Sequence, residues 1–544
     1  IVSTTNYLAK ENETLNQGYR SYTDGLIENF VTYDGKMGKH HLNIVAGHTF
    51  QRESHHSLTG IGTTMPEPYY LQVGNAETRN ASSFESEHVL TSYIGRVNYD
   101  YGERYLFQAT VRRDGSSRLS NDGRWGWFPS ASLGWRIDKE PFFNVDPQLV
   151  SLLKLRASYG VLGNENIGDY QFMATMARGN YTYSFNGDKV TGSAISDYVN
   201  TALKWEKKKT LDIGLDYAMF GGKLEFNADW YKSVSEDLLY SVPVPAEAGA
   251  TNGSVTMNAA TMENTGLEFA LAWHDYGHDL KYDISANLTL PKNKVTSLGM
   301  GESQRIDGDC ITRVGSEVGQ FYGYVYEGIF QNQDEIDNRI NAEGLHVNQN
   351  GAQPGDVAYK DVNNDGEITG DDRTILGSGM AKVQFGLSFR LEYKGFDLNV
   401  ATFGAAGYQV MDFIDRTLRG SYGATNKSVD LVNAWTPENP STTVPRVYWA
   451  STGSITNDMF SSRFLQNGAY WKISNVELGY NLPDKWFKDV ISGVRVYVSG
   501  QNLATISKYR GYNIDFAGGT FTPGYNYCSY PTPMTVMFGV NLSF

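Results

Sequence analysis

Strict alternation of apolar and polar side chains is the feature of this sequence that most limits its fold. In one segment Tyr105, Phe107 and Val111 fall on one face, and Gln108 and Thr110 fall on the other. Neighbouring side chains of a β-strand point to opposite faces, so this period of two predicts strands that are apolar on one face only. The chain contains about 15 or 16 such segments of roughly 9–11 residues, the length that a tilted strand needs to cross a bilayer. Helical periodicity is almost absent, and we predict an all-β protein.

The composition excludes several other classes. No apolar run approaches the ~18 residues of a transmembrane helix. The 60 acidic and 46 basic residues give a net charge of −14, which argues against a nucleic-acid partner. Cys310 and Cys528 are too few and too far apart for a disulfide scaffold or a thiolate metal site. A transmembrane β-barrel fits, because its alternating strands are not detected by average hydropathy, and the 57 glycines and 13% aromatic residues are in keeping with that class.

The connections between the predicted strands alternate between short and long. The short ones are Asp100–Arg104, Asp138–Ser151, Phe220–Lys223, His274–Asp279, Lys394–Gly395 and Pro483–Gly493. The long ones are Gln51–Leu90, Leu162–Lys207, Ser235–Glu263, Lys292–Gly379, Gly407–Asn467 and Leu503–Pro533. Outer-membrane barrels have short periplasmic turns and long extracellular loops. We therefore predict a transmembrane antiparallel β-barrel in which Lys292–Gly379 lies outside the cell and the apolar faces of Leu211–Tyr217 and Leu224–Trp230 point to lipid.

No catalytic motif stands out in the chain, and we predict that it is not an enzyme. It contains no nucleophile elbow, no zinc-protease motif and no phosphate-binding loop. The histidines at 40–41 and 55–56 are adjacent pairs, whose side chains point to opposite faces of a strand and do not chelate readily. We interpret them as polar strand or loop residues.

The segment Asp361–Asp372 (DVNNDGEITGDD) predicts a cation-binding loop of the EF-hand type. Gly366 at position 6 permits the sharp turn, and Thr369 at position 9 is placed to act through a water molecule. Asp at position 12 is shorter than the usual Glu, which favours lower affinity for Ca²⁺ and more competition from Mg²⁺. The alternative is a turn rich in Asn, Asp and Gly that holds no ion. The predicted ligands are Asp361, Asn363, Asp365, Glu367 through its backbone carbonyl, and Asp372.

Several segments, taken in order, resemble the SusC/RagA-type TonB-dependent outer-membrane transporters over essentially the whole chain. They are Arg124–Arg136 (RWGWFPSASLGWR), Lys154–Gly168 (KLRASYGVLGNENIG), Leu203–Glu206 (LKWE), Glu263–Glu268 (ENTGLE), Gly319–Tyr324 (GQFYGY), Pro354–Gly366 (PGDVAYKDVNNDG), Trp435–Pro440 (WTPENP), Val476–Pro483 (VELGYNLP) and Gly500–Leu503 (GQNL). The resemblance implies a 22-stranded barrel occluded by an N-terminal plug, a size also typical of plugged transporters. We find neither a plug nor the first strands in residues 1–544, and we interpret the chain as the C-terminal portion of the barrel.

The resemblance also implies a function. The expected activity is import of oligosaccharides across the outer membrane of a Gram-negative bacterium, where the barrel lies in a bilayer of lipid and lipopolysaccharide. The expected partners are a SusD-like surface lipoprotein and TonB, which is contacted through the missing N-terminal region. An oligopeptide importer is the main alternative; a metal-chelate or haem transporter and a barrel enzyme or adhesin are weaker ones. Tyr422, Tyr448 and Trp449 are candidate substrate contacts, because aromatic rings stack on the C–H faces of sugars.

Overall fold

The computed structural model describes residues 14–65, 72–195, 197–245, 247, 252–299, 301–420, 426–447, 457–486, 491–516 and 518–544. Within these ranges nearly all regular structure is β-strand, and the α-helices are the short α1 (Gln333–Asp337) and α2 (Phe413–Arg419). None of the helices in the described ranges is long and apolar enough to cross a bilayer.

The long strands form one sheet whose order follows the chain, once the short strands inside the connections are set aside. In the described ranges this sheet has fifteen strands, and pairs such as β1–β2, β2–β3 and β19–β20 are antiparallel, which confirms the predicted all-β barrel architecture. The strands are β1 (Thr14–Met37), β2 (His40–Thr63), β3 (Thr78–Tyr101), β4 (Tyr105–Ser116), β5 (Trp125–Arg136), β6 (Val150–Asn164), β9 (Glu206–Met219), β10 (Leu224–Pro243), β11 (Ser254–Asp275), β12 (Leu280–Ser297), β19 (Val383–Tyr393), β20 (Phe396–Ala406), β23 (Tyr470–Asn481), β24 (Gly493–Ser507) and β26 (Thr535–Ser543).

Unit 1, the first of two compact units, contains Ile1–Leu133, Ser158–Thr210 and Ser235–Ala260. Its strands β1 and β2 pair over all of their 24 residues, and β2 pairs with β3 over the same length. The predicted long connection Gln51–Leu90 is therefore wrong over most of its length, because β2 continues to Thr63 and β3 begins at Thr78. Backbone ladder bonds do not need side-chain alternation, so the hairpin extends past the segments that the alternation marks. The hairpin β7 (Met176–Phe185) and β8 (Asp188–Ile195) forms a separate sheet.

Unit 2 contains Gly134–Ala157, Leu211–Val234 and Thr261–Phe544. Its strands β12, β19, β20, β23, β24 and β26 pair in that order. The two-residue turn between β19 and β20 has positive φ at both Lys394 (49°) and Gly395 (87°), as a type I′ hairpin turn requires. This turn belongs to the predicted short set.

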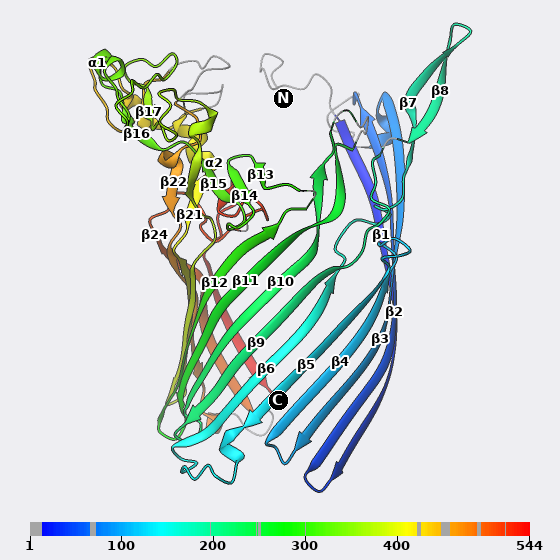
Figure 1. Cartoon of the computed structure of the whole chain (residues 1–544). Helices are drawn as coiled ribbons and strands as arrows, with labels where there is room; N and C mark the ends of the chain where they lie inside the picture. Colours follow the sequence, from blue (N-terminus) through cyan, green and yellow to red (C-terminus); the bar gives the residue numbers. More distant parts are fainter. Residues whose placement is uncertain are drawn as a thin grey trace. The chain divides into compact units, whose positions relative to one another are not determined.

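The long connections of unit 2 are folded rather than irregular (Figure 1). Their short elements are β13 (Gln304–Asp307), β14 (Cys310–Arg313), β15 (Gln320–Gly323), β16 (Tyr326–Ile329), β17 (Val357–Tyr359), β18 (Thr374–Gly377), β21 (Gln409–Asp412), β22 (Leu465–Asn467) and β25 (Tyr525–Asn526). Two clusters of buried side chains support them. One cluster contains Cys310, Phe321, Met411, Phe460, Phe464 and Tyr525, and the other contains Tyr324, Val347, Val357, Tyr359 and Ile368.

The two faces of β9 carry different chemistry, as the alternation predicts. Leu211 and Ile213 are 37% and 49% exposed, whereas Asp212 and Asp216 on the other face bind Arg156 from β6. An apolar outer face with ion pairs behind it is what a transmembrane barrel strand needs, because its outer surface contacts hydrocarbon and its inner surface contacts water.

Candidate functional site

Three segments that carry the family resemblance meet around Phe128 in unit 1. The Phe128 ring packs edge-to-face on Trp205, with 5.2 Å between ring centroids, and both side chains are buried. The indole Nε1 of Trp205 donates to the Arg124 carbonyl at 2.8 Å. At Gly163 an added Cβ would lie 2.2 Å from Phe128 Cζ, so only glycine lets the strand approach the ring. The resembling segments therefore build one packed cluster.

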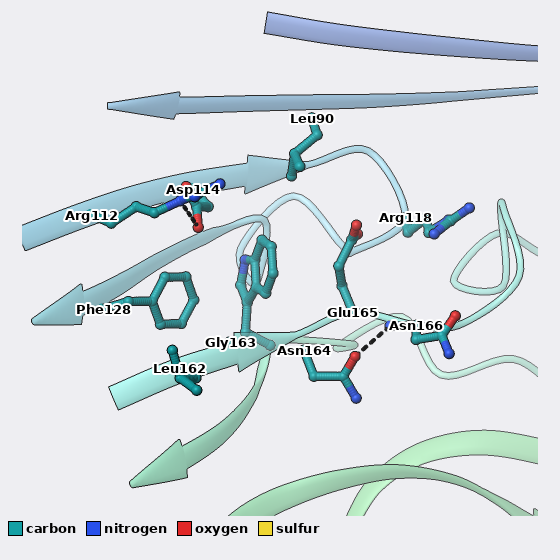
Figure 2. A pocket seen from close by; sticks show the side chains of 11 residues that line it. Leu90, Arg112, Asp114, Arg118, Phe128, Leu162, Gly163, Asn164, Glu165 and Asn166 are labelled. Carbon is teal, nitrogen blue, oxygen red and sulfur yellow. Dashed lines mark hydrogen bonds and ion pairs between the residues drawn. The ribbon is translucent and has the colours of Figure 1, made fainter. Parts of the chain in front are cut away.

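A cavity of 390 Å³ lies beside this cluster (Figure 2). Figure 2 shows Phe128 and Leu162 at the lower left with the Arg112–Asp114 pair above them, and Arg118, Glu165 and Asn166 toward the right. The lining residues are Leu90, Arg112, Asp114, Arg118, Phe128, Leu162, Gly163, Asn164, Glu165, Asn166 and Trp205. A concave site with an apolar wall and a few placed polar groups is the usual form of a binding pocket.

The charged residues of the cavity wall are paired. Arg112 Nε lies 2.6 Å from Asp114 Oδ1, and Arg118 Nε lies 2.8 Å from Asp169 Oδ1. Burial is the largest single influence on the pKa of Asp169 and raises it, but the hydrogen bonds from Arg118 and Ser86 and the nearby positive charges together lower it by more. The pKa of this carboxyl therefore lies below its usual range. The wall therefore presents fixed ion pairs rather than a free charge at these two places.

A buried histidine lies next to the cavity. His88 Nε2 is 3.1 Å from Glu165 Oε1, and the Ser116 hydroxyl donates to the same carboxylate. These residue types also occur in nucleophilic triads, but there the base uses opposite ring nitrogens for the nucleophile and the carboxylate. Here Ser116 and Glu165 both lie at Nε2, and Glu53 Oε2 lies 3.7 Å from Nδ1. Ser116 is fully buried and its hydroxyl donates to Glu165, so the group links neighbouring strands and gives the hydroxyl no access to a substrate.

A second charge cluster lies on unit 2. Arg156 binds three carboxylates, at 2.6 Å from Asp229, 2.9 Å from Asp216 and 3.2 Å from Asp212. Lys154 Nζ adds a contact to Asp216 at 3.2 Å. The cluster joins β6, β9 and β10 through side chains on their polar face. These ion pairs cross-link the three strands.

The predicted metal ligands lie together in one loop of unit 2. Asp365 N–H donates to Asn363 Oδ1 at 3.1 Å, and Glu367 N–H donates to Asp365 Oδ1 at 2.9 Å. Asp361 Oδ2 accepts from Gly366 N–H at 2.9 Å, so the first carboxylate of the loop is turned toward its centre. The side chains of Asn363, Asp365 and Glu367 are exposed and that of Asp361 is buried.

Asp372, at position 12, makes a different set of contacts. Its Oδ1 accepts from Val362 N–H and its Oδ2 from Thr369 N–H, both at 2.8 Å, and it is fully buried. In the structure this carboxylate ties the two ends of the loop together. Among the described residues, no group of three His, Cys, Asp or Glu side chains is gathered as a ready metal site. Any cation in this loop therefore relies on amide and backbone oxygens as well as carboxylates.

The three aromatic candidates for substrate contact, Tyr422, Tyr448 and Trp449, lie outside the described residues. The histidine pairs both lie on β2, and His41 contacts Asp34 at 3.1 Å. Sequence reasoning missed the cavity itself. Glu165 lies in the quoted segment Lys154–Gly168 and could have been flagged there, but His88 has no local signal, because its role depends on a partner 77 residues away (165 − 88).

Comparisons with known proteins agree with the fold. The family model described as "TonB dependent receptor-like, beta-barrel" matches residues 2–503. TonB-dependent receptor P3 of Formosa agariphila is 34% identical over 97% of this chain and 53% of its own length. TonB-dependent receptor SusC of Bacteroides thetaiotaomicron is 30% identical over 95% of this chain and 49% of its own length. The solved RagAB peptide transporter is similar in structure, with a TM-score of 0.82 and 25% identity over 97% of this chain and 56% of that one. The chain spans about half the length of the curated relatives it matches.

Proposed function

Because this chain belongs to the TonB-dependent receptor-like β-barrel family of the outer membrane, and is of the SusC/RagA type, we propose that the protein containing it actively imports oligosaccharides. The observation that carries the proposal is the 30% identity to SusC, which extends over 95% of the chain. The paired charges on the polar faces of β4 and β6 support it, because the inner wall of a transport barrel contacts water and polar substrate.

The partners follow from the same family type. We propose that a SusD-like surface lipoprotein covers the extracellular end and that TonB supplies energy through a part of the protein outside this chain. The folded long connections of unit 2 support the first proposal, since small sheets with their own buried clusters offer a firm surface for another protein.

An oligopeptide importer is the second candidate. The observation in its favour is the structural similarity to the RagAB peptide transporter. Both candidates need a large polar substrate to enter the barrel, and they differ only in the groups that recognise it.

The substrate class is tested by growth. A strain of the host bacterium that lacks the gene is supplied with pooled oligosaccharides, with pooled oligopeptides or with free monosaccharides as the limiting carbon source. We expect lost growth on one oligosaccharide class, with normal growth on monosaccharides and peptides and rescue by the intact gene. Normal growth on every oligosaccharide together with lost growth on peptides would overturn the substrate class in favour of the second candidate.

The partner is tested by purification. The intact protein, tagged at a terminus, is extracted from outer membranes in mild detergent, and co-purifying proteins are identified by mass spectrometry. We expect one surface lipoprotein in near-equal amount. Purification of the receptor alone, from membranes in which crosslinking also finds no lipoprotein neighbour, contradicts the partner proposal.

A further inference from the structure

The loop Asp361–Asp372 contains a buried carboxylate oxygen that has no hydrogen-bond partner. Asp361 is only 4% exposed, and its Oδ2 accepts from Asn341 Nδ2 at 2.8 Å and from Gly366 N–H at 2.9 Å. Its Oδ1 is buried and unpaired. A buried carboxylate is costly unless its oxygens are satisfied by donors or a metal ion. The lone Oδ1 is therefore open to a further donor or a cation, and the Asn364 and Asp365 N–H groups that also face this carboxylate form no well-aligned bond to it.

The backbone of the loop is bent so that further oxygens can reach the same centre. Asn364 and Gly366 have positive φ values of 60° and 87°, which wrap the chain around its first residue. A Cβ at residue 366 would lie 2.9 Å from the His346 carbonyl oxygen, so glycine is required on steric grounds too. In 12-residue calcium loops the ligands come from positions 1, 3, 5 and 7, with a glycine at position 6. Here those positions are Asp361, Asn363, Asp365 and Glu367.

The loop is fixed to its surroundings at several points. Asn348 N–H donates to the Gly366 carbonyl at 2.7 Å, and Ile368 N–H donates to the Asn348 carbonyl at 2.9 Å. The Ile368 side chain is buried in the cluster with Tyr359 and Val347. The loop is thus joined through short contacts to the segment that precedes it, from Asn341 to Tyr359.

We propose that this loop is a Ca²⁺ site in which Asp361 Oδ1, Asn363, Asp365 and the Glu367 carbonyl hold the ion. Asp372 is a positioning residue, because its two backbone hydrogen bonds close the loop around the site. Ca²⁺ accepts irregular coordination by oxygen atoms, whereas Mg²⁺ requires near-ideal octahedral geometry, so this mixed set of side-chain and backbone oxygens suits Ca²⁺ better. The ion fixes the connection between β16 and β18 as one unit. The proposal does not rest on transport or on any substrate.

The experiment uses the full-length receptor purified in detergent, stripped with EDTA and then supplied with CaCl₂ or MgCl₂. Limited proteolysis reports opening of the segment around residues 339–372, and metal analysis reports bound calcium. Ligand binding lowers the open population by a factor of 1 + [L]/Kd. At a Ca²⁺ concentration of about 100 Kd we therefore expect cleavage in this segment to slow by about 100-fold, and Mg²⁺ at the same concentration to slow it far less.

Matched variants separate ligation from charge. D361N and D365N each remove one ligand carboxylate, and we expect both to lose bound calcium and the Ca²⁺ effect on cleavage. D371N removes the same charge from an exposed position of the same loop that is not a ligand, and E367Q changes a side chain whose backbone carbonyl is the ligand. We expect both of these variants to keep calcium and the protection.

Each other outcome counts against the site. If wild type is cleaved equally fast in EDTA and in Ca²⁺, the proposed site is overturned. If D365N and D371N lose bound calcium to the same extent, the loss is a general effect of charge and the ligand assignment is wrong. Equal protection by Mg²⁺ overturns the choice of Ca²⁺. Heat-modifiable migration of the barrel on gels verifies that each variant is folded, so a loss of calcium in a folded variant is due to the loop itself.

Discussion

Gly163→Ala is expected to destabilise the barrel by a clash with a single aromatic ring. The new Cβ would lie 2.2 Å from Phe128 Cζ, whereas ordinary contacts begin at 3.4 Å, so the ring must move by about 1.2 Å (3.4 − 2.2). Trp205 packs against the same ring at 5.2 Å between centroids and opposes the movement. Inserting a methyl into such a site typically costs about 1–3 kcal/mol.

The assay is the urea midpoint of the full-length receptor folded into lipid vesicles, compared with Gly95→Ala as the control. At Gly95 a Cβ would meet only Val111 Cγ1, at an ordinary 3.6 Å, so we expect little change. The decisive variant is the double mutant with Phe128→Ala, which costs about 3–5 kcal/mol by itself. With the ring gone, Gly163→Ala should cost almost nothing, which gives a coupling energy of about 1–3 kcal/mol.

Two results would refute this reasoning. If Gly163→Ala is as stable as Gly95→Ala, the ring yields without cost and the glycine is not required. If its cost persists in the Phe128→Ala background, the strain comes from the backbone and not from the ring.

Three further changes test other parts of the structure. In intact cells a membrane-impermeant maleimide should label the exposed Cys528 and spare Cys310, because burial raises the pKa of the Cys310 thiol to about 12. If Cys528 is labelled in lysates but not in intact cells, the loop that carries it lies inside the cell. Arg156→Met leaves three partly buried carboxylates without their shared cation and should lower the free energy of unfolding in urea by about 2–4 kcal/mol. The Arg390 side chain is 58% exposed, so the control Arg390→Met should lower it by under about 1 kcal/mol, and equal losses would contradict the cross-link. Gly366→Ala places a side chain at a φ of 87° and should speed proteolysis of its loop several-fold even in EDTA, and unchanged cleavage would show that the turn carries no strain.

The sequence alone determined the fold class and the local loop chemistry. Period-two alternation is a property of neighbouring residues, so Tyr105, Phe107 and Val111 already indicate a strand with one apolar face. The turn at Lys394–Gly395 and the bend at Gly366 are equally local, since each depends on a few adjacent backbone angles. The division into short and long connections is only partly local, because most of the predicted long connections Gln51–Leu90 and Ser235–Glu263 is strand in the structure.

Only the tertiary structure decided which distant residues meet. Nothing near Phe128 in the sequence indicates that Gly163 and Trp205 will enclose its ring, and nothing near His88 indicates Glu165 as its partner. The alternation pattern predicts that β2 ends too early and that β3 begins too late. A hairpin continues wherever its two backbones keep exchanging hydrogen bonds, with or without alternation of side chains. Strand register joins residues tens of positions apart, and that long-range pairing is not encoded in any local pattern.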